Sequence, residues 1–158
     1  MPIRECIVLA GGLGTRLRSA VPDTPKCMAP VAGKPFLHFV INYLQAQGIE
    51  SFIFSLGYMH EVIDEFLLAH YPLLNYQLSI EEEPLGTGGA IRLACKKATE
   101  PNVLVLNGDT MYKTDLAKLS AFHHQHAAAC TLSLKPMHDF DRYGVVEINK
   151  DGYIQSFK

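Results

Sequence analysis

The chain has 158 residues, of which 48% are hydrophobic and 19% are charged, and its formal net charge is −2. This composition excludes an intrinsically disordered chain, and the charge balance excludes a generally basic surface for nucleic acid. The length predicts one domain, residues 1–158, with a substantial core. Because no apolar run reaches membrane-spanning or signal-peptide length, we expect a cytoplasmic protein that binds neither nucleic acid nor membranes.

Helices and strands are expected to alternate along the chain. In chain order we expect a strand at 4–10, a helix at 35–47, a strand at 51–56, a helix at 59–70, a strand at 76–81, a helix at 86–98, a strand at 102–106, a helix at 114–126 and a strand at 128–135. Two further strands, at 145–149 and 153–157, predict a hairpin. This alternation predicts an α/β fold with a mostly parallel sheet and helices on both faces.

Three polar, glycine-containing segments follow predicted strands. They are L-A-G-G-L-G-T-R-L at residues 9–17, E-E-E-P-L-G-T-G-G at 81–89 and N-G-D at 107–109. In parallel sheets, ligands bind beyond the carboxyl ends of the strands. We therefore expect the three segments to converge on one edge of the sheet.

The first of these segments predicts a polyphosphate site. Gly11, Gly12 and Gly14 offer bare backbone N–H groups as an anion cradle, and Arg16 and Lys26 add full positive charge. The spacing fits neither the dinucleotide pattern G-x-G-x-x-G nor the Walker A loop. The alternatives are a plain tight turn for the glycines and a solvated surface position for the lysine.

Asp109 ends an apolar strand opposite the predicted cradle, where a carboxylate is well placed to hold Mg²⁺. The alternative is a turn-forming Asp. His123 and His126 are one helical turn apart, but a polar helix end is favoured there over a metal site.

The four cysteines form no C-x-x-C pair, so a zinc or redox motif has no support. We expect Cys6, Cys95 and Cys130 to be small buried hydrophobes. Cys27 follows a lysine that could activate its thiol, although a packed residue is favoured.

The ordered motifs L-A-G-G-x-G-T-R-L, P-K, E-P-L-G-T-G-G-A, N-G-D and R-Y-G resemble those of the sugar-1-phosphate nucleotidyltransferases, and within them the mannose-1-phosphate and D-glycero-D-manno-heptose 1-phosphate guanylyltransferases. The resemblance implies a Rossmann-like three-layer sandwich with a mostly parallel, mixed central sheet. It also implies the reaction of an NTP with a sugar 1-phosphate to give an NDP-sugar and pyrophosphate, with Mg²⁺, as a step in sugar nucleotide and polysaccharide biosynthesis.

The same resemblance implies roles for individual residues. Arg16 matches the arginine that gathers the leaving pyrophosphate, Lys26 the lysine at the α-phosphate, and Asp109 the metal carboxylate. Tyr143 and Gly144 match the segment near the sugar. The positions that match nucleotide-binding residues are Leu9, Ala10, Gly11, Gly12, Gly14, Thr15, Glu81, Gly86, Thr87 and Gly108.

Base choice is predicted from Glu81, the position that resembles the base-reading side chain, with Gly86 letting the ring approach. An ionised carboxylate only accepts hydrogen bonds, and guanine offers two adjacent donors, N1–H and N2–H. Glu81 therefore favours GTP over other NTPs. The alternative is one charge in a solvated acidic run.

The sequence ends directly after a predicted strand, whereas members of this family continue with further sugar-binding and metal-binding segments. We therefore expect the domain to be truncated on its C-terminal side. This leaves open a non-catalytic nucleotide-binding or assembly module, and homo-oligomer formation is also left open.

Overall fold

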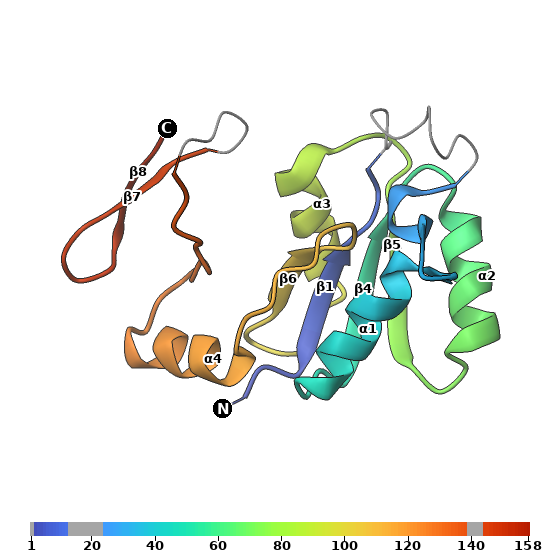
Figure 1. Ribbon diagram of the computed structural model, residues 1–158, viewed down its shortest axis with the longest axis horizontal. Helices are drawn as coiled ribbons and strands as arrows, with labels where there is room; N and C mark the ends of the chain where they lie inside the picture. The colour runs from blue at the N-terminus through green and yellow to red at the C-terminus, as the bar shows by residue number, and fades with distance from the viewer. Residues whose placement is uncertain (1, 13–23, 139–143) are drawn as a thin grey trace.

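The computed structural model describes residues 2–12, 24–138 and 144–158. Figure 1 shows a central sheet with helices packed around it, and a C-terminal hairpin that stands apart from the sheet. The elements are β1 (Glu5–Leu9), the 3₁₀ turn η1 (Lys26–Met28), β2 (Pro30–Val31), β3 (Lys34–Pro35), α1 (Phe36–Ala46), β4 (Ser51–Leu56), α2 (His60–His70), β5 (Asn75–Ile80), α3 (Gly86–Cys95), β6 (Leu104–Asn107), α4 (Leu116–Gln125), β7 (Val146–Ile148) and β8 (Ile154–Phe157).

The central sheet has the strand order β5-β4-β1-β6, and all of its neighbouring strands are parallel. Ile7 of β1 lies opposite Ile53 of β4 on one side and Val105 of β6 on the other. The described antiparallel pairs, β2–β3 and β7–β8, form two small separate sheets. The α/β prediction is confirmed, as is the hairpin.

The two faces of the sheet bury alternate residues of the same strands. Cys6, Val8, Phe52 and Phe54 pack with the buried side chains of α1 and α2. Their neighbours Ile7 and Ile53 point to the other face, where they pack with Ala94 of α3. Because side chains alternate across a strand, one apolar run supplies both layers, and this is the three-layer arrangement.

The helix ends follow local sequence signals. Pro35, which cannot donate a backbone hydrogen bond, stands directly before α1, and Gly48, with φ +91°, follows its end. Asp115 caps α4 by accepting a hydrogen bond from the backbone N–H of Lys118 at 3.0 Å. No helix among the described residues is long and apolar enough to cross a membrane.

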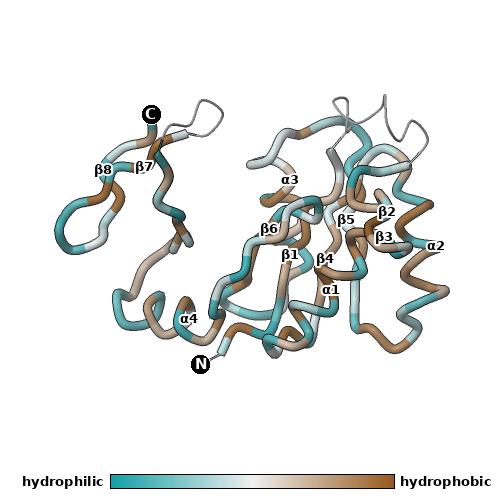
Figure 2. Tube along the Cα trace, viewed as in Figure 1, coloured by the Kyte–Doolittle hydropathy of each residue, from teal (hydrophilic) through white to brown (hydrophobic). Residues whose placement is uncertain are grey.

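The strand predicted at 128–135 is wrong, because residues 131–137 form no regular element. They run away from α4 and are held through side chains, with Thr131 Oγ1 2.9 Å from His123 Nδ1 and Ser133 Oγ 3.3 Å from Thr114 Oγ1. We call residues 131–138 and 144–158 the C-terminal arm. Hydrophobic residues recur in β7 and β8 although these strands stand apart from the sheet (Figure 2); Phe157 is 69% exposed.

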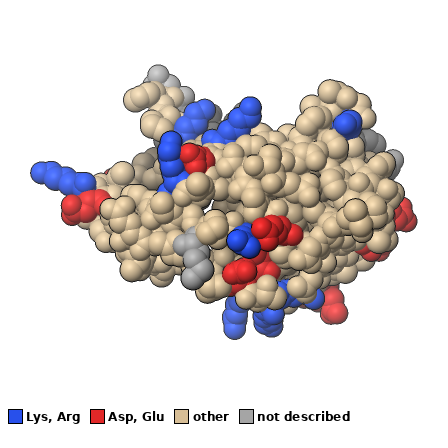
Figure 3. Space-filling view, turned by 90° about the horizontal axis from the view of Figure 1, so that it is seen from below, with Lys and Arg blue, Asp and Glu red and all other residues tan. Residues whose placement is uncertain are grey.

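Two cysteine predictions are also wrong, since Cys95 and Cys130 are exposed, whereas Cys6 and Cys27 are buried as expected. Cys95 is the last residue of α3, on the outer side of the helix, and Cys130 lies in the stretch that forms no strand. On the face shown in Figure 3, cationic and anionic side chains are interspersed.

Candidate active site

A cavity of about 1040 Å³ lies at the carboxyl ends of the sheet strands. Segments that follow β1, β4, β5 and β6 contribute to its wall, as does the turn η1. The convergence expected from the sequence is therefore confirmed. The sequence-predicted residues that line the cavity are Leu9, Ala10, Gly11, Gly12, Lys26, Glu81, Gly86, Thr87 and Asp109.

The glycine segment after β1 is held against the end of β4. The backbone N–H of Ala10 donates to the carbonyl of Ser55 at 2.8 Å. A Cβ on Gly11 would lie 3.1 Å from the backbone nitrogen of Gly57 and 3.2 Å from Glu81 Oε1. A Cβ on Gly57 would lie 3.0 Å from the carbonyl oxygen of Gly11. Both positions therefore favour glycine, because a larger side chain would push the two backbones apart.

Asp109 is brought to the cavity by Gly108, which is buried behind the wall. The backbone N–H of Gly108 donates to the carbonyl of Leu9 at 2.8 Å, and a Cβ there would lie 3.1 Å from Val8 Cγ1. This close packing against β1 extends the parallel pairing by one residue beyond β6. It fixes the carboxylate next to the glycine segment.

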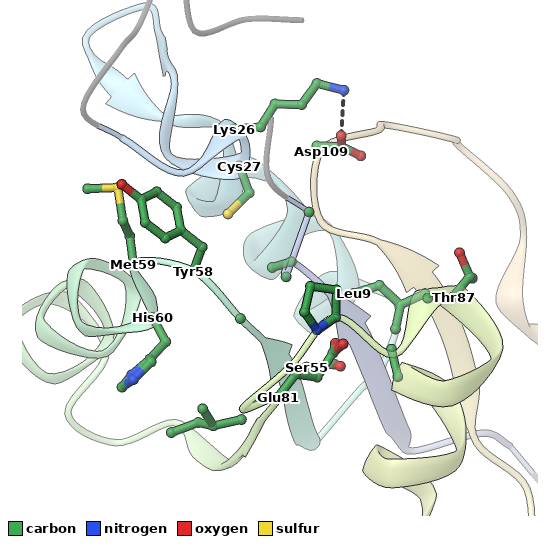
Figure 4. Close-up of a pocket in the computed structure, with 18 of the residues that line it drawn as sticks. Leu9, Lys26, Cys27, Ser55, Tyr58, Met59, His60, Glu81, Thr87 and Asp109 are labelled. Atoms are coloured by element: carbon green, nitrogen blue, oxygen red, sulfur yellow. Dashed lines mark hydrogen bonds and ion pairs between the residues drawn. The ribbon is translucent and has the colours of Figure 1, made fainter. Parts of the chain in front are cut away.

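Lys26 meets this carboxylate from the opposite wall. It opens the short turn η1 directly after Pro25, whose fixed φ restricts the approach of the chain. Lys26 Nζ lies 2.5 Å from Asp109 Oδ2, and the two side chains are 40% and 29% exposed. Figure 4 shows this pair at one end of the cavity and Glu81 well away from it. The hydroxyl of Thr110 donates to the other carboxylate oxygen, Oδ1, at 3.2 Å.

Glu81 follows β5 and continues the sheet, since its backbone N–H donates to the carbonyl of Leu56 at 2.8 Å. Its Oε2 accepts a hydrogen bond from the backbone N–H of Leu85 at 3.0 Å, which fixes the orientation of the carboxylate. Gly86, with φ +68°, then begins α3 in a conformation that glycine adopts readily.

Sequence reasoning missed one wall of the cavity, the loop after β4. Gly57, Tyr58, Met59 and His60 all line the cavity, and Met59 has a positive φ of 59° at the start of α2. This wall could have been predicted, because the strand expected at 51–56 ends at the same edge of the sheet as the segments at 9–17, 81–89 and 107–109.

Burial raises the pKa of the Cys27 thiol to about 12, and the nearby Asp109 carboxylate adds to this rise. A thiol with so high a pKa is protonated at neutral pH and is a poor nucleophile. Cys27 is only 2% exposed, so the packed alternative is confirmed by its burial.

Other predicted positions lie away from the cavity or outside the described residues. Gly14, Thr15, Arg16 and Tyr143 lie outside the described residues. Gly144 is exposed at the base of the β7–β8 hairpin and does not line the cavity.

Both ring nitrogens of His123 contact neighbouring side chains, with Nε2 3.1 Å from Asn102 Oδ1 and Nδ1 close to Thr131. These contacts agree with a structural role for His123 at the end of the helix. The described residues contain no group of three His, Cys, Asp or Glu side chains that could hold a metal ion by themselves.

A family model described as nucleotidyl transferase matches residues 5–158. The chain belongs to the nucleotidyl transferase family.

Two curated relatives are both named D-glycero-alpha-D-manno-heptose 1-phosphate guanylyltransferase. The relative from Aneurinibacillus thermoaerophilus is 50% identical over 98% of this chain and 66% of its own length. The relative from Campylobacter jejuni is 44% identical over 98% of this chain and 67% of its own length. The chain thus spans about two thirds of the length of these relatives.

Solved structures show the same fold. HddC from Yersinia pseudotuberculosis complexed with GMP-PN aligns with a TM-score of 0.79 and 35% identity, covering 98% of this chain and 68% of HddC. The inositol-1-phosphate CTP transferase from T. maritima aligns with a TM-score of 0.77 and 20% identity, covering 99% of this chain and 64% of that chain. At this lower identity the likeness concerns the fold alone.

Proposed function

We propose that this protein is a guanylyltransferase that joins GTP and a sugar 1-phosphate of the mannose or heptose type to give a GDP-sugar and pyrophosphate. The observation that carries the proposal is the cavity in which Lys26 and Asp109 face each other beside the glycine segment, with Glu81 at a distance from them. The names of the two heptose 1-phosphate guanylyltransferases quoted above support the same reaction.

The chemistry asks the protein for positioning and charge rather than for a covalent intermediate. An oxygen of the sugar phosphate attacks the α-phosphorus of GTP in line, and the bond to pyrophosphate breaks. Lys26 would stabilise the charge that develops on the α-phosphate, and Arg16 would gather the leaving pyrophosphate. Tyr143 and Gly144 would contact the sugar.

The donor set at Asp109 fits a divalent cation. Mg²⁺ is commonly bound by one or two carboxylates together with substrate phosphates, so a site where no three His, Cys, Asp or Glu side chains of the described residues gather suits a metal that arrives with a triphosphate. Bound there, Mg²⁺ would neutralise charge on the attacking or leaving oxygens. Asp109 would hold it, with Thr110 orienting the carboxylate.

Glu81 would read the guanine base. The Leu85 N–H group donates to Oε2 and fixes the orientation of the carboxylate, whose two oxygens would accept from N1–H and N2–H of guanine. We expect Glu81→Gln to reduce the preference for GTP over UTP by at least about tenfold, because an amide presents a donor where the carboxylate accepts. An unchanged ratio of kcat/KM for the two nucleotides would leave Glu81 only the structural role of holding the Leu85 N–H group.

The decisive experiment is pyrophosphate release from GTP, ATP, UTP, dTTP and CTP, each with mannose 1-phosphate, glucose 1-phosphate and a heptose 1-phosphate. Release with GTP and a mannose- or heptose-type sugar supports the proposal. Binding of GTP without release from any pair would favour the non-catalytic nucleotide-binding module.

Lys26→Ala tests the assigned chemistry. We expect kcat to fall by about 10²–10³, by analogy with the loss of one oxyanion donor. Lys97→Ala is the matched control, since Lys97 is an exposed lysine beyond the end of α3, outside the cavity lining. Near-normal turnover by the Lys26 variant would refute the role.

A further inference from the structure

We propose that Lys26 and Asp109 act as a counter-ion pair that makes the cavity select the cation–nucleotide complex over either ligand alone. The inference rests on the proposed function in so far as it takes a nucleoside triphosphate as the ligand. It concerns how the two ligands enter the site, and it does not depend on the sugar or on turnover.

The pair joins two groups that the chemistry needs apart. Lys26 Nζ and Asp109 Oδ2 are 2.5 Å apart, close enough for a charge-assisted hydrogen bond. A phosphate needs the ammonium group, and a divalent cation needs the carboxylate oxygen. A phosphate competes with Asp109 for the ammonium group, and the ammonium charge of Lys26 repels a divalent cation that approaches the carboxylate.

The geometry holds both groups in place, so the contact is not a chance meeting of two long side chains. Gly108, packed against β1, fixes the backbone of Asp109, and the Thr110 hydroxyl occupies its other oxygen, Oδ1. On the lysine side, Pro25 is buried and Lys26 begins a turn whose next residue, Cys27, is also buried. Of the two side chains, lysine is the longer and more flexible, so the pair would open by movement of Lys26.

Breaking the contact between Lys26 and Asp109 requires the same free energy whether one ligand binds or two. A cation that binds alone lowers its own affinity by that amount, and so does a triphosphate that binds alone. When both bind, the contact is broken only once, and Lys26 then faces a phosphate while Asp109 faces the cation. Each ligand therefore raises the affinity for the other, and the effect is reciprocal.

The size of the effect follows from the exposure of the pair. Partly exposed ion pairs contribute modestly, which corresponds to lowering the affinity for each single ligand by about 1.5- to 5-fold. Direct contact between the cation and the phosphates adds to this coupling but does not depend on Lys26.

The first arm of the test uses Mn²⁺ alone, titrated into the full chain and followed by the electron paramagnetic resonance signal of the free ion. Lys26→Met should bind Mn²⁺ about 1.5- to 5-fold more tightly than the unmodified protein, because Asp109 then has no ion pair with Lys26. Lys97→Met removes the same charge near the opposite end of the sheet and should leave Mn²⁺ affinity unchanged. If Lys26→Met binds Mn²⁺ no better than Lys97→Met does, the proposal is overturned.

The second arm uses GTP in EDTA, followed by titration calorimetry. Asp109→Asn should bind metal-free GTP more tightly than the unmodified protein, although it removes a residue assigned to the site. Equal or weaker binding would overturn the proposal. Thermal unfolding of each variant checks its fold, and Lys26→Gln and Asp109→Ser replace any variant that does not fold.

The third measurement is the factor by which GTP raises Mn²⁺ affinity. It should be smaller in Lys26→Met than in the unmodified protein, and an equal factor would contradict the coupling. The Mn²⁺ arm needs no nucleotide and no turnover. A protein that makes no GDP-sugar can therefore still pass it, which separates failure of this inference from failure of the proposed function.

Discussion

Glu5 is a fully buried carboxylate at the start of β1. It accepts hydrogen bonds from the backbone N–H of Thr99 at 2.9 Å, from the Thr99 hydroxyl at 3.1 Å and from the backbone N–H of Glu100 at 3.0 Å. The hydroxyl of Ser51 donates to it at 3.4 Å. This one side chain therefore ties the turn after α3 to the edge of the sheet opposite the cavity.

Glu5→Gln should lower the free energy of unfolding by about 1–3 kcal/mol, because the new amide NH₂ group faces donors and leaves buried N–H groups unpaired. Urea denaturation measures the change. Glu50→Gln, the same chemical change at an exposed position that pairs with Arg4, is the control and should stay within about 0.5 kcal/mol. Equal effects of the two variants would show that Glu5 has no special anchoring role.

His38 on α1 is held in its neutral form by its surroundings. Its Nε2 is 3.0 Å from the Asn42 amide nitrogen and 3.3 Å from Lys34 Nζ, both of which are donors. Its Nδ1 therefore carries the proton and donates to the Tyr71 hydroxyl at 2.7 Å. Desolvation first, then the charges of Lys34 and His70, lower the pKa of His38 below its usual value.

The sign of the resulting pH dependence follows from proton binding. Because the folded state binds a proton at His38 less readily than the unfolded chain does, the contribution of His38 to stability is present above about pH 6.5 and declines as the pH falls below it. We expect the stability difference between the unmodified protein and His38→Gln to be smaller at pH 5.5 than at pH 7.5. Urea midpoints at the two pH values test this, and a difference that grows at low pH would contradict it.

At the scale of elements, the contact between the ends of β1 and β4 determines the floor of the cavity. Gly57→Ala would place a Cβ 3.0 Å from the carbonyl oxygen of Gly11, and backbone atoms must move to make room. We expect GTP affinity to fall by about tenfold, since overpacking of this kind costs about 1–3 kcal/mol. Calorimetric titration with GTP and Mg²⁺ measures it.

Gly88→Ala is the control for that change. Gly88 lies within α3, and an added Cβ there has no neighbour within 4 Å. It should bind GTP as the unmodified protein does and be slightly more stable, since alanine favours helices. If Gly57→Ala also binds GTP normally, the glycine contact does not shape the cavity.

The central elements were predictable because their signals are local. The strand at 51–56 has the predicted bounds, and α1 and α2 differ from their predictions by one residue at each changed end. The end of α3 was placed three residues too late, since Lys96 and Lys97 are compatible with a helix but belong to a final turn. Apolar periodicity determines such elements, whereas their last turn depends on tertiary contacts.

The strand expected at 128–135 shows what local reasoning lacks. Its alternation of Cys130, Leu132 and Leu134 with polar residues is typical of a strand, but a strand exists only where a neighbour pairs with it. The described structure places no strand beside it. The same limit applies to the site: its strand ends were predictable from topology, but the pairing of Lys26 with Asp109 required coordinates.

At the scale of the whole molecule, backbone hydrogen bonding is distributed unevenly between the central sheet and residues 131–137. β1 and β4 each pair with strands on both sides and lie in the core, whereas residues 131–137 are held mainly by side-chain contacts. We expect backbone amides of β1 and β4 to exchange with deuterium at least about a hundredfold more slowly than those of residues 131–137. Exchange followed by mass spectrometry tests this, and similar protection of the two regions would contradict it.

The touching glycines behind the cavity also limit how its specificity could be redesigned. Since a side chain at Gly11 or Gly57 would press on backbone atoms 3.0–3.2 Å away, substitutions in that wall would displace the backbone before they changed recognition. Altered base preference would have to come from the opposite side, through Glu81 and the turn that leads into α3. Libraries directed there would vary recognition while leaving the rigid backbone floor intact.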